Sequence, residues 1–90
     1  MIVSNDAANQ VAGRTGRGVL TVVPITSNTS RVFPFQVLLP AAPCGLSVDS
    51  KAQAEQVRSL ATARVRRRVG SLPAALLADL DTALRVHLGL

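Results

Sequence analysis

The first long apolar stretch of the chain, Val19–Ile25, leads directly into a polar cluster. A short continuous run rich in valine predicts a buried β-strand rather than a helix. Pro24 would interrupt a helix, and it marks this strand as an edge strand or a bulge. The cluster Thr26–Ser30 carries only hydroxyl and amide side chains, so it forms either a turn or a functional site at the strand end.

A second β-strand is predicted over Val32–Leu39, where side chains alternate between two faces of a sheet. The set expected to face the core consists of Phe33, Phe35, Val37 and Leu39. Pro34 again favours an edge position. Residues 40–46 contain two prolines and a glycine, which indicates a turn-rich connection.

A third strand with a bend is predicted over Asp49–Leu60, and Met1–Val3 predicts the end of a further strand. Neither face of Asp49–Leu60 is purely apolar, so we expect both faces to be occupied, by a dimer interface or by a site. Within this stretch, Glu55 and Arg58 are close enough in sequence to form a local ion pair.

The clearest helix is predicted over Ser71–Leu88. Ser71 is a favourable N-cap, and Pro73 falls in the first turn, where its missing N–H is not needed. Gly89 is expected to end the helix. An apolar stripe at helical spacing indicates a core-facing side, made of Leu76, Leu77, Leu80, Leu84 and Leu88.

The composition restricts both the fold and the partners. A chain of 90 residues forms one domain, residues 1–90, and its two aromatic residues leave the core to aliphatic side chains. Because 48% of the residues are hydrophobic and the interior is small, we expect oligomerisation to bury part of this surface. The net charge is +5 and nine of the ten basic residues are arginines, which indicates an anionic partner such as nucleic acid.

Two basic stretches are candidates for contact with such a partner. Arg14 and Arg17 lie in a loop that contains three glycines, residues 7–18. This loop is either a flexible connection or a segment that approaches phosphates. The run Arg66–Arg68 is either a solvated basic surface or a phosphate-contacting patch.

Other reactive residue types are scarce. The single cysteine, Cys44, permits no disulfide within the chain and indicates a reducing, cytoplasmic setting. His87 is expected at the exposed end of the helix rather than in a site. The five carboxylates are scattered and suggest no two-metal site. No apolar run approaches the roughly 20 residues that cross a bilayer, so we expect no membrane span.

Four segments, in this order and at this spacing, resemble the MazF/PemK/Kid family of toxins. They are Met1–Asp6, Val19–Asn28, Asp49–Leu60 and Leu84–Leu90. The resemblance implies a mainly β fold with α: a small SH3-like β-barrel of the MazF/CcdB type with a C-terminal helix, assembled as a homodimer. The family's first strand and an Arg-Pro pair would fall upstream of Met1, so this chain is expected to lack them.

The resemblance also implies a function. Members of the family are mRNA interferases of type II toxin–antitoxin modules, which cleave single-stranded RNA at specific sequences and inhibit translation and growth. The ribose 2′-hydroxyl attacks the adjacent phosphate, with no metal and no cofactor. The chain is therefore expected to be a cytoplasmic endoribonuclease whose partners are single-stranded mRNA and an acidic, MazE-like antitoxin.

The same resemblance implies which residues form the site. It places Thr26, Ser27 and Glu55 in the catalytic group, as donors to the phosphate and as an acid or base. It assigns contact with RNA to Arg14, Arg17, Asn28, Gln56 and Arg58. Two alternatives remain open: a truncated homologue that dimerises or binds an antitoxin without cutting RNA, and a small basic nucleic-acid-binding barrel.

Overall fold

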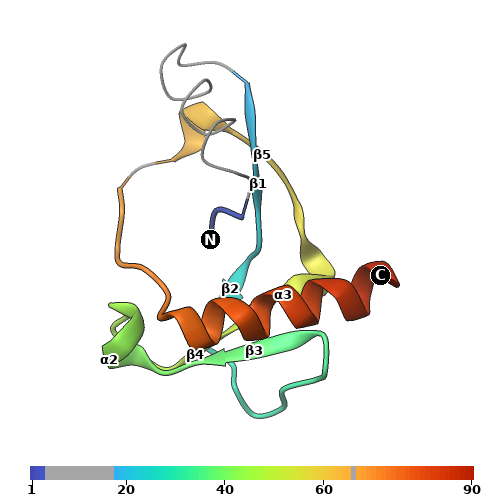
Figure 1. The fold of residues 1–90 in the computed structure, drawn as a ribbon. Coiled ribbons are helices and arrows are strands. Elements are labelled where there is room, and N and C mark those ends of the chain that lie inside the picture. Colours follow the sequence, from blue (N-terminus) through green and yellow to red (C-terminus); the bar gives the residue numbers. More distant parts are fainter. Residues whose placement is uncertain (4–17, 66) are drawn as a thin grey trace.

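The structure, a computed structural model, describes residues 1–3, 18–65 and 67–90 (Figure 1). In chain order the elements are β1 (Val19–Val22), β2 (Ile25–Thr26), β3 (Gln36–Leu39), α2 (Ala41–Cys44), β4 (Ser50–Gln53), the 3₁₀ turn η1 (Ala54–Gln56), β5 (Arg58–Ala61), the 3₁₀ turn η2 (Thr62–Arg64) and α3 (Ala74–Leu88). This mixed β architecture with a C-terminal helix is the expected one. Arg14, Arg17 and Arg66 lie outside the described residues.

The described strands form two antiparallel sheets. β1 pairs with β5, while β2, β4 and β3 lie side by side in that order. The prediction of one strand over Val19–Ile25 is therefore wrong, because the chain leaves the first sheet after Val22 and enters the second at Ile25. Pro24 lies at this crossing, where it has no N–H to donate and its carbonyl accepts the Gln53 N–H at 2.9 Å.

The predicted third strand also divides between the two sheets. β4 belongs to the three-stranded sheet and β5 to the two-stranded sheet. The bend expected within Asp49–Leu60 is the turn η1, which closes with a 3.1 Å hydrogen bond from the Val57 N–H to the Ala54 carbonyl. Mixed polarity on both faces of this stretch therefore reflects two strands in two different environments.

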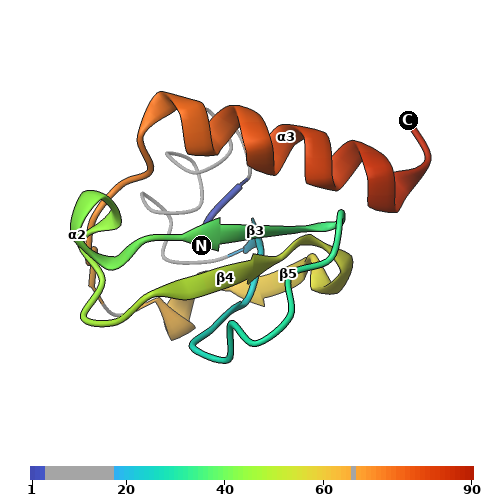
Figure 2. The ribbon, with the colours of Figure 1, turned by 90° about the horizontal axis from the view of Figure 1, so that it is seen from below.

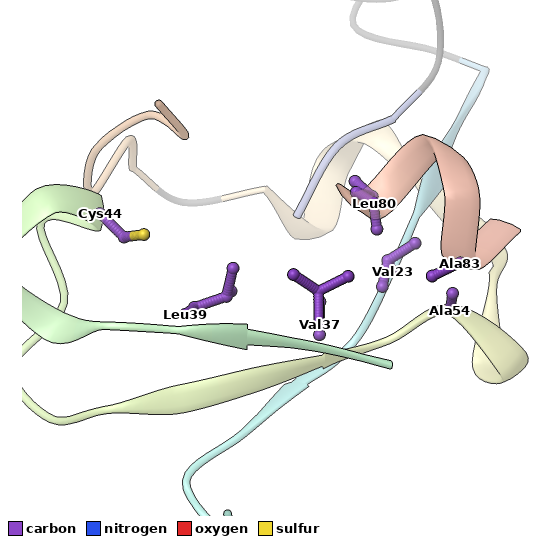
Figure 3. Packing of buried hydrophobic residues seen from close by; sticks show 8 residues of the cluster. Val23, Val37, Leu39, Cys44, Ala54, Leu80 and Ala83 are labelled. Carbon is purple, nitrogen blue, oxygen red and sulfur yellow. The ribbon is translucent and has the colours of Figure 1, made fainter. Parts of the chain in front are cut away.

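The main core lies between α3 and the three-stranded sheet, and α3 runs across one face of that sheet (Figure 2). Leu39 and Val23 are fully buried, and Leu80 and Ala83 of α3 are 2% and 1% exposed. Figure 3 shows Val23 and Val37 next to Leu80 and Ala83 of the helix, with Leu39 between Val37 and Cys44. The core is aliphatic, as the composition predicts.

Phe33 and Phe35 do not join this core, contrary to the prediction. β3 begins only at Gln36, because the chain turns before it and the Phe33 carbonyl accepts the Gln36 N–H at 2.8 Å. Phe33 is 39% exposed and Phe35 is half-buried, whereas Val37 and Leu39 are buried as predicted. The alternating pattern therefore holds only within the hydrogen-bonded strand.

Helix α3 confirms the predicted C-terminal helix but begins later than predicted. Its N-cap is Pro73 and no side chain caps it, so Ser71 is not the N-cap. It ends at Leu88, and Gly89 follows with a left-handed φ of 72°. Of the predicted leucine stripe, Leu80 is buried, Leu76 and Leu84 are half-buried, and Leu77 and Leu88 are exposed.

The described strands leave the two sheets open rather than closed into a barrel. One edge of the segment Met1–Val3 is hydrogen-bonded to β1 of the two-stranded sheet. The Val3 N–H donates to the Thr21 carbonyl at 2.8 Å. No described strand pairs with the other edge of this segment. An open cavity of about 1480 Å³ lies between this segment, β5 and α3. Partial burial beside it lowers the pKa of the Met1 amino group, which donates to the Val23 carbonyl at 3.0 Å.

Two glycines allow a close contact between α2 and the segment that leads into α3. Gly45 ends α2 with a φ of 72°, and a Cβ on Gly70 would lie 2.4 Å from the Cys44 carbonyl oxygen. Because backbone would have to shift, we expect Gly70→Ala to lower the free energy of unfolding by about 1–3 kcal/mol. Denaturation followed by circular dichroism measures this change, with the exposed neighbour Ser71→Ala as a control. Equal stability of the two variants would contradict the contact.

Candidate active site

Thr26 ends β2 on the face of the sheet that points away from the main core. It lies opposite Lys51 of β4, which in turn lies opposite Leu38 of β3. Directly opposite residues share a face, with Cβ atoms about 4.5–5.5 Å apart. Ala52 and Val37, the next pair along the ladder, are buried in the main core. Thr26 and Lys51 therefore lie together on the outer face.

The polar cluster that follows β2 is a hydrogen-bonded turn. The Thr26 hydroxyl accepts the Asn28 N–H at 3.2 Å. The Asn28 side-chain oxygen accepts the Ser30 N–H at 3.3 Å and the Ser30 hydroxyl at 2.8 Å. Thr26 is half-buried, while Ser27 and Asn28 are exposed. The turn thus presents polar groups to solvent, so a turn and a site can occupy the same residues.

Lys51 is a buried cation that sequence reasoning did not select. It is 8% exposed, and its ammonium group donates to the Arg31 carbonyl at 2.6 Å. Burial of a charged group is costly without polar partners, so this bond fixes the loop that carries Arg31 over β4. A lone lysine in a strand of mixed polarity gives no signal by itself. Its place opposite Thr26 comes from the strand register.

Glu55 binds Gln36, and the predicted local pair with Arg58 is wrong. The Gln36 amide nitrogen donates to Glu55 Oε2 at 2.8 Å. The Gln36 amide oxygen accepts the Phe33 N–H at 3.1 Å. Glu55 Oε1 is buried without a hydrogen-bond partner among the described residues. The carboxylate is therefore turned inward and joins η1 to the start of β3.

The structure gathers only part of the predicted site. Thr26–Asn28 lie at one end of β2, whereas Glu55 and the exposed Gln56 lie beyond the other end of β4. Glu55 follows Lys51, the partner of Thr26, by four residues, and strand residues advance about 3.3 Å each. Arg58 belongs to the other sheet and lines the cavity. Thr26 and Glu55 are thus not in contact.

The other reactive side chains are dispersed. Across residues 1–3, 18–65 and 67–90, no three His, Cys, Asp or Glu side chains form a group that could hold a metal ion. Cys44 is a buried free thiol, and His87 is exposed in the last turn of α3, as predicted. No helix in the described part of the chain has the length and apolar character to cross a membrane.

The hydrogen bond between Gln36 and Glu55 is expected to contribute to the free energy of unfolding. Gln36→Leu removes the donor to a half-buried carboxylate, so we expect it to lower the free energy of unfolding by about 1.5–3 kcal/mol. Gln56→Leu makes the same chemical change on the exposed side of η1, where a change within about 0.5 kcal/mol is expected. Urea denaturation of both variants measures the difference. A Gln36→Leu protein as stable as Gln56→Leu would show that the bond contributes nothing.

Comparison with known proteins matches this arrangement to one family. Residues 1–88 match the family described as PemK-like, MazF-like toxin of type II toxin–antitoxin system. Endoribonuclease MazF9 of Mycobacterium tuberculosis is 61% identical over 90 residues, which are 100% of this chain and 76% of that protein.

Solved structures show the same fold. The structure of Mycobacterium tuberculosis toxin MazF-mt6 is similar with a TM-score of 0.83 and 22% identity, covering 100% of this chain and 84% of that chain. A MazE–MazF structure from Deinococcus radiodurans has a TM-score of 0.77 and 31% identity, covering 100% and 79%. The family match spans nearly the whole chain and agrees with the resemblance predicted from the sequence, so the chain belongs to the PemK-like, MazF-like toxins of type II toxin–antitoxin systems.

Proposed function

We propose that this chain, an endoribonuclease by its family and its 61% identical relative, cleaves single-stranded RNA at specific sequences without a metal ion. The ribose 2′-hydroxyl attacks the adjacent phosphate and leaves a cyclic phosphate on one product and a free hydroxyl on the other. Negative charge grows on the phosphate during attack, and preorganised donors stabilise it. The observation that carries the proposal is the cross-strand pair Thr26–Lys51, which places a threonine and a lysine opposite each other on one face of the sheet.

The residues around Thr26 can act as donors to RNA. The Thr26 hydroxyl accepts one hydrogen bond and donates to no acceptor among the described residues, so its proton is available to a phosphate oxygen. The buried side chain of Lys51, the cross-strand partner of Thr26, adds a positive charge to this part of the structure. Ser27 and Asn28 are exposed and offer a hydroxyl and an amide nitrogen to the same strand of RNA. Together these groups favour phosphate binding at the end of β2.

Glu55 is proposed as the proton acceptor or donor, with a restriction. One carboxylate oxygen is bonded to Gln36 and the other is buried, so proton exchange with RNA requires this bond to open. Gln56 on the same turn is exposed and is proposed to contact RNA directly. Arg58 is proposed to contact the RNA backbone where it leaves the site.

Two protein partners are proposed. A net charge of +5 favours an acidic antitoxin segment, and a similar endoribonuclease from a mycobacterial species has a solved structure in complex with its cognate antitoxin. A second copy of the chain is proposed to cover part of the exposed apolar surface.

Cleavage of a defined single-stranded RNA in EDTA tests the proposed function. We expect discrete fragments that end in a cyclic phosphate, because the nucleophile belongs to the RNA itself. The matched control is the same RNA with deoxyribose at the cleaved nucleotide, which lacks the 2′-hydroxyl and should stay intact.

Each other outcome assigns a different function. Cleavage that needs added Mg²⁺, or that cuts the deoxyribose control, would overturn the mechanism. Binding of an antitoxin without any cleavage would favour the binding-only homologue. Salt-dependent binding of RNA and DNA alike, without cleavage, would favour the small nucleic-acid-binding barrel.

A further inference from the structure

In the loop that joins β2 to β3, Arg31 lies over one of two stacked phenylalanine rings. The guanidinium carbon of Arg31 lies 5.5 Å from the centroid of the Phe33 ring. The Phe33 and Phe35 rings have centroids 5.3 Å apart and planes only 9° from parallel. A cation over an aromatic face is attracted by the ring electrons, so the stack holds the Arg31 side chain in one place. Arg31, Phe33 and Phe35 occupy alternate positions in the sequence, and this alternation predicted that the two rings would lie in the core.

The hydrogen-bonding groups of Arg31 are unused. Its guanidinium makes no hydrogen bond or ion pair with any described residue, and the residue is exposed. The ring offers the guanidinium no oxygen acceptor, and all five N–H donors lie along the edges of the guanidinium plane. An edge with two parallel N–H groups matches two oxygens of a phosphate, so an arginine held over a ring is suited to bidentate phosphate binding.

The backbone that carries Arg31 is also held. Its carbonyl accepts the Lys51 ammonium at 2.6 Å, and Lys51 is the cross-strand partner of Thr26. The backbone of Phe33 is held too, because its N–H donates to the Gln36 amide oxygen at 3.1 Å. A loop that is ordered before binding loses less conformational entropy when a ligand arrives. Arg31 is thus held at two points. Its side chain contacts Phe33, and its backbone is bound by Lys51, the cross-strand partner of Thr26.

We propose that Arg31 is a phosphate-binding residue of the RNA site and contacts a backbone phosphate that neighbours the one at Thr26. The Phe33 and Phe35 rings orient its guanidinium, and Lys51 positions its backbone. This inference rests on the proposed function, because the ligand is the single-stranded RNA that the chain cleaves. It adds a cation to the Thr26 face from within the described residues.

Binding of an uncleavable RNA tests the assignment. The probe is a fluorescent single-stranded RNA with deoxyribose at the cleaved nucleotide, and its dissociation constant is measured by anisotropy over a range of salt concentrations. We expect Arg31→Ala to raise the dissociation constant about tenfold, as for loss of a charged hydrogen bond. The slope of log K against log salt should fall by about 0.7, which corresponds to one phosphate contact on a single strand.

Two further variants separate charge from positioning. Phe33→Leu keeps the arginine but removes the ring beneath it, so we expect weaker binding with an unchanged salt slope. Arg85→Ala is the charge-matched control. Arg85 pairs with Asp81 on α3, at 3.6 Å, and α3 covers the opposite face of the three-stranded sheet, so its loss should leave both quantities unchanged.

The outcomes distinguish the inference from the proposed function. If wild-type protein cuts RNA and Arg31→Ala binds the probe as Arg85→Ala does, the assignment of Arg31 is wrong and the function stands. If Arg31→Ala weakens binding equally at all salt concentrations, the contact is to a base and the phosphate assignment is wrong. If wild-type protein neither binds nor cuts single-stranded RNA, the proposed function fails and the Arg31 assignment fails with it.

Discussion

Thr26→Ala is expected to slow the cleavage of single-stranded RNA by about 100- to 1,000-fold, as for loss of one preorganised donor. The hydroxyl lies at the end of β2, opposite Lys51, and its proton is available to a phosphate oxygen. Because charge on the phosphate grows in the transition state, the loss should appear in kcat as well as in kcat/KM. Single-turnover cleavage at saturating protein measures the chemical step directly.

Two control variants separate this effect from damage to the fold. Thr26→Ser keeps the hydroxyl and the hydrogen bond to the Asn28 N–H, so it should retain most of the activity. Thr82→Ala removes a threonine hydroxyl from an exposed position on α3, where it bonds only to the Ala78 carbonyl, and should cleave as wild type does. If Thr26→Ala cleaves as fast as Thr82→Ala, the Thr26 hydroxyl has no part in the reaction.

The turn at one end of the candidate site could be predicted from the sequence, whereas the strand pairing that separates its members could not. Thr26–Asn28 stand out in the sequence because a polar cluster follows directly after an apolar run. In the structure this cluster likewise lies at the end of a strand, β2. Glu55 and Arg58 are neighbours in sequence, yet they face different partners because η1 carries the chain from one sheet to the other. Lys51 could not be found without the register that sets it opposite Thr26. Local order predicts turns, whereas the site depends on strand pairing.

The same limit explains the errors in the fold. The periodicity of α3 is local, so the helix was predicted from spacing alone and only its first turn was misplaced. Val19–Ile25 has the composition of one strand, but Pro24 interrupts the ladder and the two parts pair with different strands. Phe33 and Phe35 follow the alternation of β3 and still leave the core, because the strand begins after them. The family resemblance, which uses the order of whole segments, was confirmed over residues 1–88.

Stability should depend most on one side chain of β3. Leu39 is fully buried between the three-stranded sheet and α3, so we expect Leu39→Ala to lower the free energy of unfolding by about 2–5 kcal/mol, from lost burial and the cavity left behind. The total free energy of unfolding of a small domain is only about 5–15 kcal/mol, so this variant is expected to lose a large fraction of its stability. Urea denaturation followed by far-ultraviolet circular dichroism is the appropriate measurement, since the chain has no Trp or Tyr.

Leu38 provides a control in which only the face of the sheet differs. It precedes Leu39 on the same strand but is 47% exposed on the outer face, opposite Lys51, so Leu38→Ala should cost far less stability. Equal losses in the two variants would mean that β3 does not turn one face to α3. A one-residue shift of the β3–β4 register would reverse the two results, because it would move Leu38 into the core. The comparison therefore tests the β3–β4 register, which places Lys51 on the outer face of the sheet. The pairing of β2 with β4 adds Thr26 to that face, on which both the proposed active site and the assignment of Arg31 depend.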